Sequence, residues 1–194
     1  MYSNPKKYGI KSFYRANYLL YGALPAFIEN RKAKLVSETF VERLMLAVTQ
    51  VNGCEACSYA HTKMAFELGL SKEEINSFLS GSKDFVKEDE ALAILFSQNY
   101  ADIDGHPDCE MYNRITETYG AQISRVILSA VQVMQYANIF GIPLSAFLSR
   151  LKGKRYENSS LLREIGLPLS SFLIVPIAFI HYLIKRPQPL CPDK

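Results

Sequence analysis

Residues 37–61, SETFVERLMLAVTQVNGCEACSYAH, predict two helices and the turn between them. Ser37 is a good helix N-cap, and the apolar residues after it recur every three or four positions, as on the buried face of a helix. Gly53 ends this first helix, because glycine readily adopts the left-handed backbone found at helix ends. The second helix begins at Cys54 and runs to about Leu68.

The rest of the chain has helical periodicity and few strand signals. Before this pair we expect a helix over residues 11–23 and a short one opening at Pro25. After it, a capping box at Ser71 begins a helix that ends by Gly81. Further helices are expected over 87–101, 108–118 and 121–139, with an interruption at Gly141-Ile142-Pro143 and a continuation over 144–151. The sequence therefore predicts an all-α fold, a helical bundle. We expect residues 1–155 to form this domain and residues 156–194 to be an apolar C-terminal segment.

Composition limits the classes of function. The 194 residues are 48% hydrophobic, enough for one sizeable core, and the net charge is only +3. The basic residues are dispersed rather than arranged in a stripe with stacking aromatics, which argues against nucleic-acid binding. Four cysteines in a chain of this length do not resemble a secreted disulfide framework, and the first residues lack the apolar region of a secretory signal. We therefore expect a cytoplasmic protein.

The C-terminal segment is unusual, because residues 165–184 are almost entirely apolar and are followed by Lys185 and Arg186. Twenty such residues are about long enough to cross a bilayer. Two prolines, two serines and His181 interrupt the run, and these favour packing on the domain or at a subunit interface. Membrane contact is the less favoured alternative.

The second helix carries the side chains best suited to chemistry. Cys54, Cys57 and His61 recur at i, i+3 and i+7, which places them within about 60° of one another around a helix. Glu42 lies twelve residues before Cys54 on the preceding helix. The helix N-terminus favours a thiolate, His61 can take up or return its proton, and Glu42 can orient the imidazole. The two sulfurs are spaced to close a disulfide across one helical turn.

Other interpretations of these residues are less favoured. A structural zinc site normally has a second cysteine pair at short spacing, which the chain lacks, although Cys54, Cys57, His61 and Glu42 could in principle bind one ion. Attachment of a c-type haem needs histidine directly after the second cysteine, where Ser58 stands. Buried cysteines beside a hydrogen-bonded histidine remain an alternative without chemistry. We expect neither a metal nor a bound cofactor.

The pattern resembles the alkylhydroperoxidase D-like branch of the carboxymuconolactone decarboxylase superfamily. Its signature is a glutamate twelve residues before Asn-Gly-Cys-x-x-Cys-x-x-x-His, here Glu42 and residues 52–61. The resemblance is strong over about residues 35–80, looser through 87–150, and does not cover the tail. It implies that Cys54, Cys57, His61 and Glu42 are the catalytic residues. Some members carry a histidine before the second cysteine, but this chain has Ala56, so a relay through that extra imidazole is absent.

The resemblance implies a peroxidase or disulfide reductase that cycles a Cys54–Cys57 dithiol and disulfide. Helix-dipole reasoning favours Cys54 as the attacking thiol. The scheme proposed for the family favours Cys57, which also lies one turn from His61, and we adopt Cys57 with Cys54 as resolving thiol. The substrate would be a hydroperoxide or a disulfide, and a lipoyl or thioredoxin-like dithiol protein would restore the reduced pair. The resemblance also implies a homo-oligomer.

Two rival functions stay open. The first is an acid-base enzyme of the carboxymuconolactone decarboxylase type that uses Glu42 and His61, although that branch generally lacks the paired cysteines. The second is a non-enzymatic, membrane-associated protein built around residues 165–184 with a vestigial redox motif.

Overall fold

The fold is all-α, as the sequence predicts. A computed structural model describes residues 5–106, 109–156 and 159–187, and no strand occurs among them. The helices are α1 (Ile10–Ala33), α2 (Glu38–Asn52), α3 (Glu55–Glu67), α4 (Lys72–Ser80), α5 (Ala91–Asp102), α6 (Cys109–Leu151) and α7 (Leu161–Ile184).

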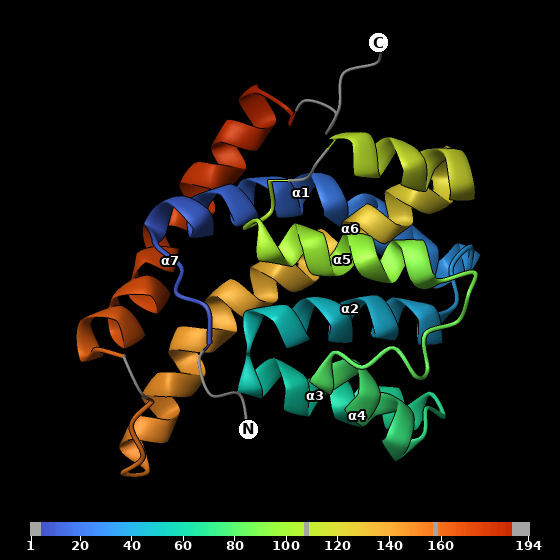
Figure 1. The fold of residues 1–194 in the computed structure, drawn as a ribbon. Coiled ribbons are helices and arrows are strands. Elements are labelled where there is room, and N and C mark those ends of the chain that lie inside the picture. The colour runs from blue at the N-terminus through green and yellow to red at the C-terminus, as the bar shows by residue number, and fades with distance from the viewer. Residues whose placement is uncertain (1–4, 107–108, 157–158, 188–194) are drawn as a thin grey trace.

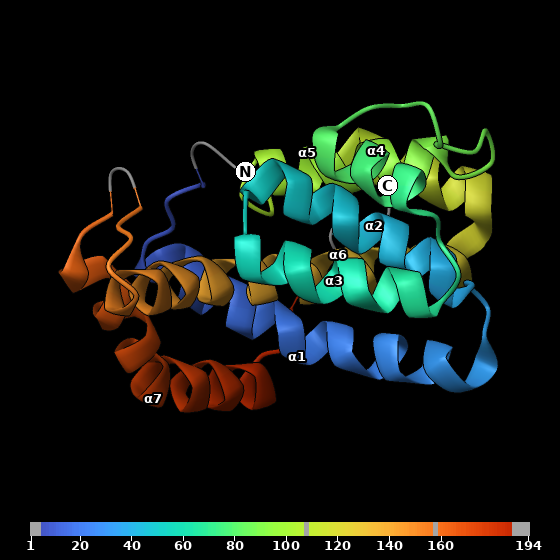
Figure 2. The same ribbon diagram turned by 90° about the horizontal axis from the view of Figure 1, so that it is seen from below.

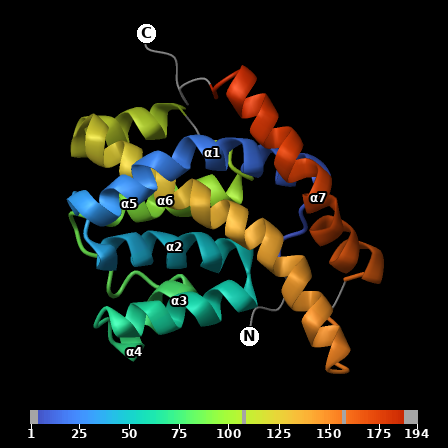
Figure 3. The same cartoon turned by 180° about the vertical axis from the view of Figure 1, so that it is seen from behind.

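The bundle is organised around α2 and α6. Helix α2 contacts α3, α4, α5 and α6, and α1 packs on α6 and α7 (Figure 1). Seen from behind, α6 runs past α1, α5 and α2 and on toward α7 (Figure 3). The apolar stripe of α2 supplies the centre of the core, where Leu44, Leu46 and Val48 are fully buried. Buried residues of α5 and α6 complete this cluster.

The turn between α2 and α3 forms as the sequence predicts. The Ser37 hydroxyl accepts a hydrogen bond from the Phe40 N–H at the start of α2, and Gly53 ends this helix with a φ of 73°. The N-terminal segment packs against the turn, because a β-carbon on Gly53 would lie 3.0 Å from the Cα of Pro5. The Lys6 N–H donates to the Asn52 carbonyl oxygen at 3.0 Å. Contacts from Pro5 and Lys6 therefore help to fix this turn, and with it the start of α3.

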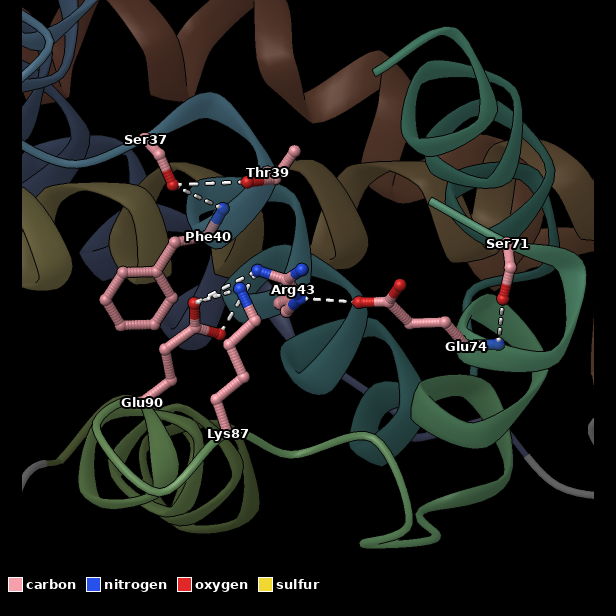
Figure 4. A network of polar contacts seen from close by, with 8 residues as sticks. All are labelled: Ser37, Thr39, Phe40, Arg43, Ser71, Glu74, Lys87 and Glu90. Carbon is pink, nitrogen blue, oxygen red and sulfur yellow. Dashed lines mark hydrogen bonds and ion pairs between the residues drawn. The ribbon is translucent and has the colours of Figure 1, made fainter. Parts of the chain in front are cut away.

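Ion pairs fasten α4 and α5 to α2. The buried Arg43 guanidinium donates to Glu74 at 2.7 Å and to Glu90 at 3.0 Å, and Lys87 lies 3.8 Å from the same Glu90 carboxylate (Figure 4). Burial raises the pKa of Glu90 above its ordinary value, and Arg43 opposes this shift. The Glu74 N–H is capped by the Ser71 hydroxyl at 3.1 Å, so the expected helix start is confirmed.

Two expected helix breaks are wrong. Pro25 lies inside the continuous helix α1, and Pro143 lies inside α6, so neither a new helix at Pro25 nor an interruption at Gly141-Ile142-Pro143 occurs. A proline removes one backbone donor, and packing against neighbouring helices outweighs this local cost. Helix α6 instead breaks at Gly120, with a φ of 77° and a ψ of 157°, where the sequence predicts the boundary between two helices.

Helix α7 lies along the outer side of α1 (Figure 2). Arg150 of α6 donates two hydrogen bonds to Glu164 in the first turn of α7, at 2.6 and 2.7 Å. Among the described residues, α6 and α7 are both long and apolar enough to cross a membrane by length and composition. The apolar window of α6 is 61% buried in the fold, whereas that of α7 is only 17% buried.

Candidate active site

Cys54 and Cys57 are joined by a disulfide across the first turn of α3, with their Cα atoms 5.3 Å apart. Cys54 is the N-cap residue of α3, and its sulfur accepts a hydrogen bond from the Cys57 N–H at 3.3 Å. Cys54 is fully buried and Cys57 is 9% exposed. Cys57 is therefore the less buried residue of the pair.

His61 and Glu42 form a hydrogen-bonded pair between α3 and α2. The His61 Nδ1 lies 2.7 Å from the Glu42 Oε2, and the two side chains are only 13% and 10% exposed. An ionised carboxylate can only accept, so the Nδ1–H donates and the Nε2 of a neutral imidazole keeps a free lone pair. His61 follows Cys57 by one helical turn. The fold therefore brings a base with a fixed tautomer to the helix that carries the thiols.

Helix α6 forms the wall behind the disulfide, which sequence reasoning did not identify. A β-carbon on Gly141 would lie 2.9 Å from both the Cys54 and the Cys57 sulfurs. The Ala137 carbonyl oxygen, one turn earlier, lies 3.7 Å from the Cys57 sulfur. Only a residue without a side chain permits this approach of α6 to the sulfurs. The available signal was a glycine within an otherwise apolar helical segment.

Two further groups hold the turn that carries the cysteines. The Tyr156 hydroxyl, from the segment after α6, donates to the Glu55 carboxylate at 2.5 Å. Burial, reinforced by Glu55, raises the pKa of Tyr156 to about 12, so this phenol stays protonated and remains a donor at neutral pH. On the other side, the Asn52 amide donates to Gln135 at 2.8 Å and accepts from the Tyr8 hydroxyl at 2.6 Å.

A groove of about 310 Å³ reaches Glu42 from the surface between α1, α2 and α3. Its lining combines apolar side chains, such as Phe27 and Met64, with the charged Arg31, Glu38 and Glu67. Because Glu42 lines the groove and also binds His61, protons can pass between solvent and the imidazole along this side.

The comparisons with known proteins point to one family. Residues 23–95 match the sequence profile of the carboxymuconolactone decarboxylase family. Comparison with curated proteins and with solved structures yields no significant match. The matched segment begins within α1, ends within α5, and includes Glu42, Cys54, Cys57 and His61. The part of the chain that forms this site is therefore similar to the carboxymuconolactone decarboxylase family.

Proposed function

We propose that this protein is a thiol-dependent oxidoreductase of the alkylhydroperoxidase D type, acting on hydroperoxides or on partner disulfides. One observation carries the proposal: the Cys54–Cys57 disulfide lies on the same helix as a histidine that is hydrogen-bonded to a buried glutamate. A purely structural disulfide across one helical turn would restrain little of the unfolded chain, because the loop it closes is very short. A redox role explains why the pair stands beside a base.

The cycle begins with a thiolate on Cys57. Its sulfur attacks the terminal oxygen of a hydroperoxide, the O–O bond breaks, and the leaving alkoxide takes a proton and departs as an alcohol. Cys57 is then a sulfenic acid. The Cys54 thiol attacks this sulfur, a disulfide forms, and the sulfenic hydroxyl leaves as water. Two thiols are oxidised and one peroxide is reduced.

Burial supports this assignment of the two sulfurs. Cys54 is covered completely, so its role is to attack a neighbouring sulfur rather than a substrate from solvent. Cys57 retains a small exposed surface and has His61 one turn away. We expect the reducing dithiol to attack the less buried cysteine as well, which makes Cys57 the point of the mixed disulfide and Cys54 the leaving thiolate. The hydrogen bond from the Cys57 N–H and the start of α3 both stabilise a thiolate on Cys54.

The His61–Glu42 pair would move the protons. The free Nε2 of His61 can accept the proton of Cys57 and return it to the departing alkoxide. Glu42 keeps the other ring nitrogen protonated and stabilises the imidazolium that forms between these steps. Electrons return from a partner dithiol, either a lipoyl group or a thioredoxin-like protein, and this chemistry requires no bound cofactor.

A thiol titration with mass spectrometry tests the proposal. The reduced protein is treated with one equivalent of an alkyl hydroperoxide. Loss of two thiols, with a bond between Cys54 and Cys57, is the expected result. Cys54→Ser should stop at a sulfenic acid on Cys57 that dimedone traps, whereas Cys57→Ser should lose the fast oxidation. Thiols that survive hydroperoxide but are oxidised by a partner disulfide, which is reduced to a dithiol, would restrict the activity to disulfide exchange.

The rival acid-base function gives the opposite result with the same variants. A decarboxylase that uses Glu42 and His61 would keep its activity on a lactone substrate in Cys57→Ser and lose it in His61→Gln. Fully inert thiols in the wild-type protein, together with such activity, would overturn the thiol mechanism.

A further inference from the structure

Helix α7 has two apolar faces, of which only one is covered. Its inner residues, such as Leu167, Ile174 and Ala178, are buried against the domain. Six large apolar side chains on the other side are each 54% to 78% exposed: Leu169, Phe172, Leu173, Ile177, Ile180 and Leu183. Their spacing of three and four residues makes them one continuous face, called here the outer stripe. An exposed apolar patch this long marks an interaction surface.

The serine and histidine side chains within the apolar run of α7 have hydrogen-bond partners in the fold. The Ser170 and Ser171 hydroxyls donate to carbonyl oxygens of their own helix, at 2.7 and 2.6 Å. The His181 Nδ1 lies 2.7 Å from the Tyr14 hydroxyl of α1, and the same ring stacks on Tyr18. These groups therefore do not oppose moving the outer stripe into hydrocarbon, where unsatisfied polar groups are costly.

Charge around the outer stripe is strongly one-sided. No charged residue occurs between Glu164 and Lys185, and exposed Arg163, Lys185 and Arg186 flank the apolar run. Over residues 150–186 the sequence has seven basic and two acidic residues, a net charge of +5, whereas the whole chain carries only +3. The positive charge of the protein is therefore concentrated on the apolar helix and the segment before it. Basic residues at an apolar surface match anionic lipid head groups.

We propose that the outer stripe of α7 docks on an anionic lipid bilayer, with the helix lying in the plane of the membrane surface. The geometry excludes a bilayer span in this fold. One face of α7 is held by α1, and α1 carries charged side chains such as Lys11 and Arg15 that cannot follow it into hydrocarbon. A helix with its apolar face in the interface and its basic ends near the head groups satisfies both constraints.

A second copy of this chain is a poorer occupant of the stripe. In a two-fold pairing of α7 with α7, whether parallel or antiparallel, the basic ends of one helix lie beside basic ends of the other. Glu164 cannot neutralise these basic ends, because its side chain is fully buried and is already ion-paired with Arg150. Like charges at both ends therefore oppose self-association along this helix, whereas they strengthen binding to an anionic surface.

The surface that would face the bilayer extends beyond α7. A groove of about 350 Å³ between α6 and α7 is lined almost entirely by apolar side chains, including Leu144, Phe147 and Phe172. Leu148 and Leu151, at the end of α6, are also well exposed. The outer stripe is therefore continuous with an apolar groove that can receive part of a lipid acyl chain.

Vesicle co-sedimentation of the full chain tests this inference. The expected result is sedimentation with phosphatidylcholine–phosphatidylglycerol vesicles, with much weaker binding to phosphatidylcholine alone and at high salt. Phe172→Glu should abolish binding. Tyr59→Glu on α3 is the matched control, because Tyr59 is 79% exposed and Phe172 78% exposed, and it should bind as the wild type does. Replacing Lys185 and Arg186 by glutamine should weaken binding by about thirtyfold, at about 1 kcal/mol for each cation.

Two outcomes would overturn the proposal. The first is protein that sediments with neither kind of vesicle and elutes as a dimer that Phe172→Glu dissociates, which would identify a second copy as the occupant. The second is Phe172→Glu protein with an unchanged circular dichroism spectrum and wild-type binding to anionic vesicles. If Phe172→Glu does not fold, the double glutamine variant at Lys185 and Arg186, which lie outside α7, tests the proposal: wild-type binding of that variant to anionic vesicles would contradict it. None of these results depends on the redox chemistry of the cysteines.

Discussion

Gly141 of α6 stands directly against Cys57 of α3, since a β-carbon on the glycine would lie 2.9 Å from the cysteine sulfur and equally close to that of Cys54. Such a contact is shorter than packed atoms tolerate, so any side chain here must push α6 away from the disulfide.

We therefore expect Gly141→Ala to destabilise the oxidised protein by about 1 to 3 kcal/mol, the usual cost of overpacking a core. Urea denaturation measures the change. Gly166→Ala is the control, because it is also a helical glycine but has no atom within 4 Å of the added β-carbon. That variant should be neutral or gain up to about 1 kcal/mol from the lower entropy of its unfolded chain. Equal stabilities for the two alanine variants would contradict the close contact.

Glu42→Gln should slow the oxidation of Cys57 by hydroperoxide by about 10²-fold or more, because the amide cannot stabilise an imidazolium at His61. Stopped-flow measurement of thiol loss gives this rate. Glu38→Gln is the matched control: it removes a carboxylate from the same helix and the same groove, without contact to His61. A similar loss of rate in both variants would indicate a general charge effect.

Arg43→Met should destabilise the fold by about 3 kcal/mol at neutral pH, because it leaves the buried Glu90 carboxylate without its main partner. Burial already raises the pKa of Glu90, so ionisation of this group costs stability as the pH rises above the ordinary carboxyl range. The loss should therefore shrink as the pH falls and Glu90 becomes protonated. Thermal melts between acidic and neutral pH measure it.

Lys87→Met provides the control for that prediction. It removes the same charge from the same carboxylate, but Lys87 is 56% exposed and lies 3.8 Å away, so the cost should stay below about 1 kcal/mol. Equal melting temperatures for Arg43→Met and Lys87→Met would contradict the larger contribution expected of the buried Arg43–Glu90 pair.

Glu164→Gln should loosen α7 at neutral pH and have little effect in acid. Hydrogen bonds from Arg150 hold the pKa of Glu164 below its ordinary value. A lowered carboxyl pKa stabilises the fold fully above the ordinary value, and this contribution is lost as the pH falls through the lowered one. Hydrogen exchange of α7 amides at several pH values measures the effect. Glu67→Gln should show no such dependence, because its pair with Lys63 is long and exposed.

The local part of the site could be predicted from the sequence. Cys54, Cys57 and His61 lie within eight residues, so helical geometry alone places them on one face, and Glu42 follows from the family signature. The identification of the family is confirmed by the profile match. The catalytic roles of these four residues stay predictions.

The rest of the site could not be predicted, because it comes from distant parts of the chain. Gly141 approaches the sulfurs from more than eighty residues away, and Tyr156 reaches Glu55 from the segment after α6. No local pattern encodes these contacts. The misplaced breaks at Pro25 and Pro143 have a related cause, since packing of whole helices overrode the backbone preference of a single residue.

Lys6 ties together two helix ends that are far apart in the sequence. Its backbone N–H is bonded to the last residue of α2, and its Nζ donates to the Ala101 and Asp102 carbonyl oxygens at the end of α5. The turn that carries the cysteines is consequently not an autonomous unit, because its shape depends on loop closures of nearly a hundred residues. A short synthetic peptide around the two cysteines should therefore behave as an ordinary flexible dithiol, without the contacts that hold this turn in the folded chain.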